Sequence, residues 1–319
     1  MSADSFSSVN SINVVKPLIE QRADPYIYKH TDGTYYFTAS VPEYDRVELR
    51  AAKTIAGLAE AEAKVLWRKH EKGIMSQHIW APEIHYVEGG WYIYFAASDV
   101  DDIWALRPYV LRCTGSDPMV DSWEEMGQMQ PSEGDDFAFT DFSLDMTVFQ
   151  HKNVWYTVWA QKVNNISNLY IAELAAPNRL KTKPVLITEP DHDWEQVDFW
   201  VNEGPAVIHH GDKLFLTFSA SGTGACYCMG LLTAQEDADL LKRESWVKTP
   251  APVLVTSPEH QAYGPGHNSF TVDENGGDLV IYHARPYEKI VGDPLYDPNR
   301  HTCVMKMIWD EKGYPVFRF

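Results

Sequence analysis

The chain has 319 residues, of which 45% are hydrophobic and 13% aromatic, enough for a sizeable core and too unbiased for a disordered chain. Its formal net charge of −18 at pH 7 argues against nucleic acid or an anionic membrane as a partner. No apolar run is long enough to cross a bilayer, and four cysteines are too few for a disulfide framework. We expect a soluble protein with a neutral ligand.

One short pattern recurs five times along the chain. Each copy has a polar residue, a β-prone strand, a turn rich in Gly, Asp or Asn, and a second aromatic strand. The polar residues recur about every 60 residues, a period that indicates radial or stacked repetition. They are Asp24, Glu83, Asp145, Glu203 and His267.

Five such copies predict an all-β fold, a five-bladed β-propeller that forms a single domain over residues 1–319. The blades are expected to begin near residues 17, 79, 142, 201 and 264. Residues 1–15 are expected to add a strand to the last blade and so close the ring. Good helix formers predict short helical turns within 53–61 and 233–241. The first twenty residues lack the pattern of a secretory signal, so we expect a cytoplasmic protein.

The polar residues that head the five copies are predicted to converge, because the innermost strands of a propeller begin at one end of its axis. Three of them, Asp24, Asp145 and Glu203, are acids, and two carboxyl groups beside an acetal bond are the minimum for glycoside hydrolysis. Glu203 precedes Gly204-Pro205, a tight neighbourhood in which burial would raise its pKa and suit it to be the general acid. Asp24 is the candidate base, and Asp145 could tune Glu203.

Other residues are candidates for binding. Trp80 is expected to pack on a sugar face, with His78 beside it, although a core position would also explain the tryptophan. Arg285 is expected to hydrogen-bond a sugar hydroxyl or to form a surface ion pair, and Glu83 either contacts ligand or is structural. His267 could bind a calcium ion through water, or a buried water alone. Motifs for zinc, nucleotides and acyl transfer are absent from the sequence, so no organic cofactor is expected.

At these residues the chain resembles glycoside hydrolase family 43, five-bladed propellers that include arabinofuranosidases, arabinanases and β-xylosidases. The resemblance implies an inverting mechanism with Asp24 as general base, Glu203 as general acid and Asp145 as the residue that modulates the pKa. It also implies that His267 lies near a calcium in members that carry one. The motifs are Arg22-Ala23-Asp24-Pro25, His78-Ile79-Trp80-Ala81-Pro82-Glu83, Ser143-Leu144-Asp145, Val201-Asn202-Glu203-Gly204-Pro205 and Gly266-His267-Asn268-Ser269.

Residues 20–25 and 37–46 are similar to those of exo-acting α-L-arabinofuranosidases. The resemblance therefore implies release of L-arabinofuranose from the non-reducing ends of α-1,5-linked arabino-oligosaccharides. The alternatives are a β-xylosidase or endo-arabinanase of the same family, or a non-catalytic sugar-binding propeller. No C-terminal β-sandwich, which some β-xylosidases use to close the site, is expected. An inverting mechanism predicts that the carboxyls of Asp24 and Glu203 lie roughly 6.5–9.5 Å apart.

Overall fold

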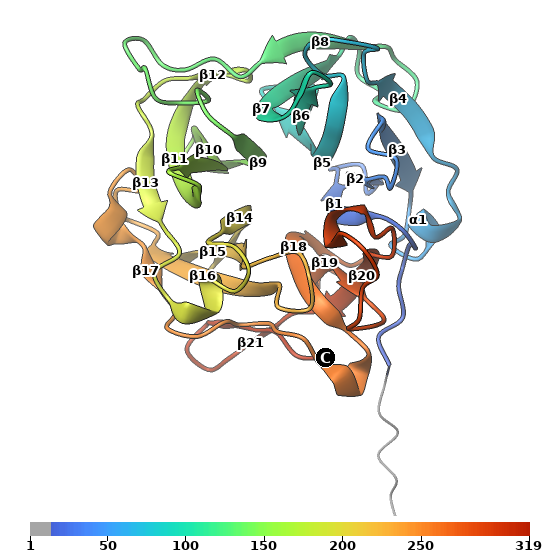
Figure 1. The fold of residues 1–319 in the computed structure, drawn as a ribbon, viewed down its shortest axis with the longest axis vertical. Coiled ribbons are helices and arrows are strands. Elements are labelled where there is room, and N and C mark those ends of the chain that lie inside the picture. The colour runs from blue at the N-terminus through green and yellow to red at the C-terminus, as the bar shows by residue number, and fades with distance from the viewer. Residues whose placement is uncertain (1–13) are drawn as a thin grey trace, which may run out of the picture.

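The computed structural model describes residues 14–319, which form a ring of five β-sheets around a central axis (Figure 1). This arrangement confirms the predicted five-bladed β-propeller. The first two blades contain β1 (Ala23–Lys29), β2 (Tyr35–Ser40), β3 (Arg46–Ala52) and β4 (Lys64–Arg68), then β5 (Gln77–Val87), β6 (Gly90–Asp99), β7 (Asp102–Cys113) and β8 (Trp123–Gln128). The third contains β9 (Ser143–His151), β10 (Val154–Val163), β11 (Ile166–Ala176), β12 (Arg179–Leu180) and β13 (Val185–Thr188).

The last two blades contain fewer long strands. The fourth has β14 (Asn202–His210), β15 (Lys213–Ala220), β16 (Cys228–Gln235) and β17 (Val247–Lys248), and the fifth has β18 (Tyr263–Val272), β19 (Asp278–Arg285) and β20 (His301–Lys306). A small hairpin of β21 (Ile308–Trp309) and β22 (Pro315–Val316) follows. Within each blade, strands that are consecutive in the chain pair antiparallel, except that β12 and β13 both pair with β11.

Helices are few and short. The described residues contain α1 (Gly57–Glu60) and the 3₁₀ helices η1 (Asp193–Glu195), η2 (Arg243–Ser245), η3 (Pro258–His260) and η4 (Pro294–Tyr296). The helical turn expected within 53–61 is confirmed by α1. The one expected within 233–241 is wrong, because residues up to Gln235 belong to β16, which pairs with β15 and β17. Strand pairing overrides a modest helix propensity there. None of the helices in residues 14–319 has the length and apolar character needed to cross a membrane.

The hydrophobic core lies between the blades. Each of five buried clusters joins side chains from neighbouring blades, for example Leu144 and Val158 of the third blade with Leu216 and Phe218 of the fourth. A sheet with two apolar faces must bury both, and a closed ring provides a neighbour for each face. The repeated pattern of the sequence therefore becomes a ring in which every blade supports the next.

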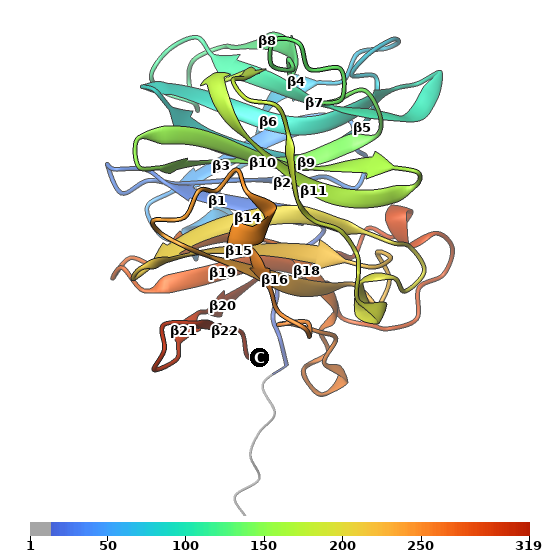
Figure 2. The same cartoon turned by 90° about the vertical axis from the view of Figure 1, so that its left-hand side faces the viewer.

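The N-terminal segment closes the ring beside β20. The Leu18 N–H donates to the carbonyl oxygen of Thr302 at 2.7 Å, and the Thr302 N–H donates to the carbonyl oxygen of Ile19 at 2.9 Å. This antiparallel bridge gives the three-stranded fifth blade a fourth backbone neighbour. Figure 2 shows the strands of this last blade from the side. A bridge to the last blade is thus present, but at residues 18 and 19, beyond the stretch 1–15 that was expected to provide it. Residues 1–13 of that stretch lie outside the described part of the chain.

Each innermost strand has a two-residue irregularity at its start. In β1, for instance, the register passes from Ala23 opposite Ser40 to Tyr26 opposite Thr38, so two residues of β1 face one of β2. Such β-bulges bend a strand and redirect a side chain. The first residue of each bulge has a positive φ. Two of the strands have an extra bulge before the main one, at His78 (51°) in β5 and at Gly264 (60°) in β18. The main bulges of the five strands begin at Asp24 (52°), Ala81 (45°), Asp145 (54°), Gly204 (55°) and His267 (43°).

The preceding blade holds the backbone N–H of four of these residues. The Asp24 N–H donates to His283 Nδ1 at 3.1 Å, and the Gly204 N–H donates to Asp145 Oδ2 at 3.0 Å. The other two N–H groups donate to serine hydroxyls. The Ala81 N–H donates to the Ser40 hydroxyl at 2.7 Å, and the His267 N–H donates to the Ser219 hydroxyl at 2.6 Å. The bulges are therefore fixed by bonds between blades.

Candidate active site

A cavity of about 400 Å³ opens where the innermost strands begin. Asp24, Asp145, Glu203 and His267 all line it, as the predicted convergence of these residues requires. Glu83 does not line it, because the bulge of β5 is at Ala81 and places Glu83 two residues beyond. Its carboxylate instead bonds His85 at 2.8 Å, the structural alternative for this residue. The other lining residues include Trp80, Trp104, Phe142, Lys162, Phe199, Val201, Gly222 and Arg300.

Asp24 is held as a carboxylate. Its Oδ2 accepts a hydrogen bond from the Ser40 hydroxyl at 2.6 Å, and Arg300 Nη1 and His267 Nδ1 each lie 3.3 Å from Oδ1. Burial alone would raise the pKa of Asp24, but the positive charges of Arg300 and His267 hold it well below its usual range. Asp24 is therefore ionised near neutral pH, the state that a general base needs.

His283 supports Asp24 without carrying a charge. Burial lowers the pKa of His283 to about 3, so its ring is neutral. Its Nδ1 can then accept the Asp24 N–H, the bond described above, and the ring stacks on Tyr227 with centroids 5.5 Å apart. His283 thus orients the backbone at Asp24.

Asp145 and Glu203 are two neighbouring carboxyls in the cavity, the first buried and the second half-buried. Burial raises the pKa of Asp145 to about 8 and also raises the pKa of Glu203. The two groups therefore hold a proton between them near neutral pH. Asp145 accepts the Gly204 N–H and lies 3.8 Å from His267 Nδ1, contacts that favour its anion, whereas Glu203 accepts a bond from the Tyr227 hydroxyl at 2.8 Å. Each of the two carboxyls thus accepts a hydrogen bond that favours its anion and opposes the effect of burial.

Gly204 has no side chain and therefore allows a close contact with His267. Its φ of +55° is one that residues with a side chain rarely adopt, and a Cβ there would lie 3.0 Å from Cγ of His267. The glycine thus lets His267 approach the strand that carries Glu203. The Gly-Pro neighbourhood noted in the sequence is the bulge itself.

The surroundings of His267 suit a hydrated hard cation. Burial alone would lower the pKa of His267, but Asp145 and Asp24 raise it. The next residue, Asn268, is buried, and neither atom of its side-chain amide has a hydrogen-bond partner among the described residues. A free amide oxygen is a ligand that calcium accepts, directly or through water.

The predicted binding residues differ in where they lie. Trp80 lines the cavity, and His78 stacks behind it with ring centroids 4.3 Å apart. His78 does not line the cavity; its Nδ1 contacts the carbonyl oxygen of Ile103 at 2.8 Å and its Nε2 lies 3.2 Å from the Tyr296 hydroxyl. His78 is therefore placed to support Trp80.

Arg285 is not placed to bind a sugar hydroxyl. Its guanidinium is buried and donates to Asp297 Oδ1 at 3.2 Å and to the carbonyl oxygens of Thr223 and Pro294 at 2.6 Å each. The alternative for this residue was a surface ion pair. The structure contains an ion pair with Asp297, but it is buried and not at the surface. Arg285 ties together two loops at the cavity, because Thr223 is itself a lining residue.

Sequence reasoning missed four residues beside the acids, namely Tyr227, His283, Lys162 and Arg300. One signal was available for His283. It lies opposite the residue before a bulge, as Ser40 and Ser219 do in their blades, so a finer alignment of the second strands would have placed it. Arg300 follows a long connection outside the repeated pattern, and no spacing points to it.

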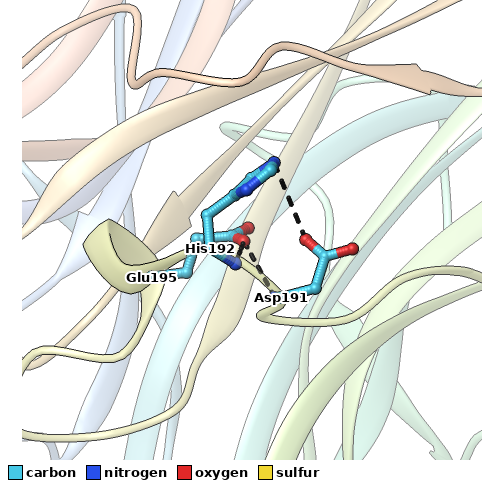
Figure 3. Close-up of side chains that lie close together, drawn as sticks. All are labelled: Asp191, His192 and Glu195. Carbon is cyan, nitrogen blue, oxygen red and sulfur yellow. Dashed lines mark hydrogen bonds and ion pairs between the residues drawn. The ribbon is translucent and has the colours of Figure 1, made fainter.

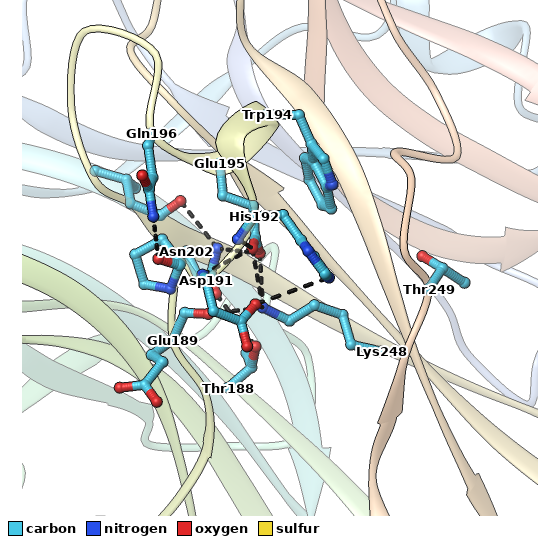
Figure 4. A network of polar contacts seen from close by, with 12 residues as sticks. Thr188, Glu189, Asp191, His192, Trp194, Glu195, Gln196, Asn202, Lys248 and Thr249 are labelled. Carbon is cyan, nitrogen blue, oxygen red and sulfur yellow. Dashed lines mark hydrogen bonds and ion pairs between the residues drawn. The ribbon is translucent and has the colours of Figure 1, made fainter.

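A second polar cluster lies near the fourth blade. Ligand atoms of Asp191, His192 and Glu195 are within 4.8 Å of one another, which is compatible with a metal site (Figure 3). However, Lys248 Nζ lies 2.7 Å from Asp191 Oδ1 and 2.8 Å from Glu195 Oε1 (Figure 4). The ammonium group therefore takes the place of a metal ion in this cluster.

Comparison with known proteins assigns the family. The model of glycosyl hydrolases family 43 matches residues 14–315. The chain belongs to this family. A solved α-L-arabinofuranosidase from Lactobacillus brevis superimposes on this family 43 chain with a TM-score of 0.90 and 52% identity, covering 96% of each chain.

Two curated relatives come from Streptomyces. One from Streptomyces avermitilis is 50% identical over 96% of this chain and 63% of its own length, and one from Streptomyces chartreusis is 45% identical over 87% and 84%. Both are named extracellular exo-α-(1→5)-L-arabinofuranosidases. The chain thus spans less than two thirds of the first relative. Their names contradict the expected cytoplasmic location, which had rested on the few cysteines and on the missing signal pattern in the first twenty residues.

Proposed function

We propose that this chain is an inverting, exo-acting α-L-arabinofuranosidase that releases L-arabinofuranose from the non-reducing ends of α-1,5-linked arabino-oligosaccharides. The observation that carries the proposal is the opposite state of two acids in one cavity: Asp24 has a lowered pKa and Glu203 a raised one. Pairs of carboxyls whose pKa values are driven apart supply a base and an acid at one pH. The names of the relatives support arabinose as the sugar.

In the proposed reaction the Asp24 carboxylate takes a proton from a water molecule, which attacks the anomeric carbon from the face opposite the leaving group. Glu203 gives its proton to the glycosidic oxygen as the bond to the leaving sugar breaks. Asp145 is proposed to share this proton with Glu203 and so to modulate the pKa at which Glu203 gives it up. Trp80 is proposed to pack on the bound arabinose.

The alternatives have less support. A non-catalytic sugar-binding propeller has no need for a lowered and a raised carboxyl pKa in the same cavity. Among the solved xylanolytic and arabinanolytic neighbours, sequence identity is only 17% or 16%, so those likenesses concern the fold alone.

The test is digestion of linear α-1,5-arabino-oligosaccharides, followed by product analysis and by proton NMR of the first product. We expect arabinose alone, released initially as the β-anomer. Internal oligomers would indicate endo cleavage, release from a xyloside instead would indicate a β-xylosidase, and an initial α-anomer would exclude inversion. Glu203→Ala is expected to lose activity on oligosaccharides and to keep most of it on a nitrophenyl arabinoside, whose leaving group needs no acid.

A calcium ion near His267 belongs to the same proposal. Asn268 would hold it, largely through water, and His267 would take part in its neutral form; the charge of the ion would then replace that of the imidazolium beside the anions of Asp24 and Asp145. Metal analysis of the purified protein is expected to find calcium, and EDTA treatment is expected to lower its melting temperature until calcium is restored. A metal-free protein whose melting temperature ignores both EDTA and calcium would contradict this.

A further inference from the structure

A buried ion pair lies behind the strand that carries Glu203 (Figure 4). The side chain of Glu195, at the end of η1, is 0% exposed, and Lys248 Nζ of β17 lies 2.8 and 3.0 Å from its two oxygens. A buried carboxylate is costly unless its partners are complete. The remaining partners show what this pair holds in place.

Three further donors form hydrogen bonds to the carboxylate oxygens of Glu195. Its Oε2 accepts the N–H groups of Asp191 at 3.0 Å and His192 at 2.8 Å, and its Oε1 accepts the side-chain amide of Asn202 at 2.9 Å. Lys248 also donates to the carbonyl oxygen of Glu189 at 2.6 Å. One carboxylate therefore ties the loop before β14, the start of β14, and β17 together.

Asn202 connects this network to the active site. It is fully buried and directly precedes Glu203, and successive side chains of a strand point to opposite faces. The Asn202 amide accordingly reaches Glu195 on one face while Glu203 lines the cavity on the other. The amide oxygen of Asn202 accepts a bond from Thr188, and its carbonyl oxygen accepts one from Ser167. The residue that directly precedes Glu203 is thus held by hydrogen bonds to Glu195, Thr188 and Ser167.

We propose that Glu195 is a positioning residue for the general acid, acting through Asn202. The inference rests on the proposed role of Glu203. A general acid must lie within hydrogen-bond reach of the leaving oxygen, and a displacement of about 1 Å can cost ~100-fold in rate. The buried network limits such displacement. It also holds the loop that contributes Phe199 and Val201 to the cavity wall.

The experiment compares two substrates, an arabino-oligosaccharide, which needs the acid, and a nitrophenyl arabinoside, which does not. Glu195→Gln is expected to lower kcat on the oligosaccharide by about tenfold or more, with KM little changed, because the acid is misplaced. Its kcat on the nitrophenyl arabinoside is expected to change by less than about threefold. Asn202→Leu is expected to give the same selective loss while leaving the Glu195–Lys248 pair intact, and it decides the matter if Glu195→Gln does not fold.

Glu48→Gln is the matched control. Glu48 of β3 is also buried, with a side chain 5% exposed, and pairs with Arg22 at 2.7 Å and Arg46 at 3.1 Å, but it does not line the cavity. It is expected to lower the melting temperature without favouring either substrate. If Glu195→Gln and Asn202→Leu behave like this control, the network is only structural and the inference is wrong.

Glu203→Ala on the same two substrates separates this inference from the proposed function. If Glu203→Ala loses both activities equally, the role of Glu203 as acid is wrong and the inference falls with it. If Glu203→Ala is selective but the variants at Glu195 and Asn202 are not, only the inference fails.

Discussion

Tyr227 governs how firmly Glu203 holds its proton. Burial raises the pKa of Glu203, and the hydrogen bond from the Tyr227 hydroxyl opposes that rise because it stabilises the carboxylate. A general acid works best when its pKa lies near the working pH, and this bond, together with the larger effect of the positive charge on His267, keeps the acid from becoming too weak. The residue was not predicted, since a tyrosine among 17 in the sequence carries no distinguishing pattern.

Tyr227→Phe is expected to move the alkaline limb of the kcat/KM profile to higher pH. The variant removes a bond that lowers the pKa of Glu203, so the carboxyl keeps its proton to a higher pH. The measurement is the pH dependence of kcat/KM on an arabino-oligosaccharide. Tyr287→Phe, which alters a tyrosine bonded to Asp297 outside the cavity lining, serves as control and should leave the limb in place. A limb that moves to lower pH in Tyr227→Phe would contradict this account.

At the scale of elements, the bulge explains why the sequence located some residues of the site and not others. Asp24, Asp145 and His267 are the first residues of their bulges, so a simple count along the repeat brings them together. Glu203 precedes its bulge and Glu83 follows one, yet the period of about 60 residues cannot resolve shifts of one or two positions. The loops that Arg285 contacts lie outside the repeated pattern, so the repeat could not predict these contacts.

The bulge of β14 offers a test of its own. Gly204→Ala is expected to destabilise the protein by about 1–2 kcal/mol from the positive φ and to lower activity, because the new Cβ displaces His267. Gly276→Ala is the matched control, since Gly276 also has a positive φ, +85°, but open space around its Cβ position. Melting curves and kcat on an arabino-oligosaccharide should show both variants destabilised and only Gly204→Ala impaired. Equal activities would argue against the close approach of His267.

At the scale of the whole molecule, the ring is closed by few bonds between residues far apart in the chain. Ile19 is buried in the cluster between the fifth and first blades, beside Ile27 and Ile281. The sequence predicted this closure from the short fifth blade, because a propeller needs its last sheet completed. It could not predict the residues that make the bridge, since the lead-in has no strand pattern.

Ile19→Ala is expected to lower the free energy of unfolding by about 2–5 kcal/mol, the usual cost of removing a buried isoleucine side chain. Ile308→Ala is the matched control, because Ile308 is 58% exposed and should change stability by less than about 0.5 kcal/mol. Urea unfolding followed by tryptophan fluorescence measures both. Similar stabilities would show that the ring does not depend on this closure.

The contacts of Asp24 have a consequence for how the protein is made. The carboxylate comes from the first blade, while His267, His283 and Arg300, which neutralise or orient it, come from the fifth blade or its connections and are synthesised later. A nascent chain that has formed only its first four blades therefore contains the proposed base without the partners that hold it in place when it is buried. Hydrolytic competence would then appear only after residue 300 has left the ribosome and the fifth blade has docked.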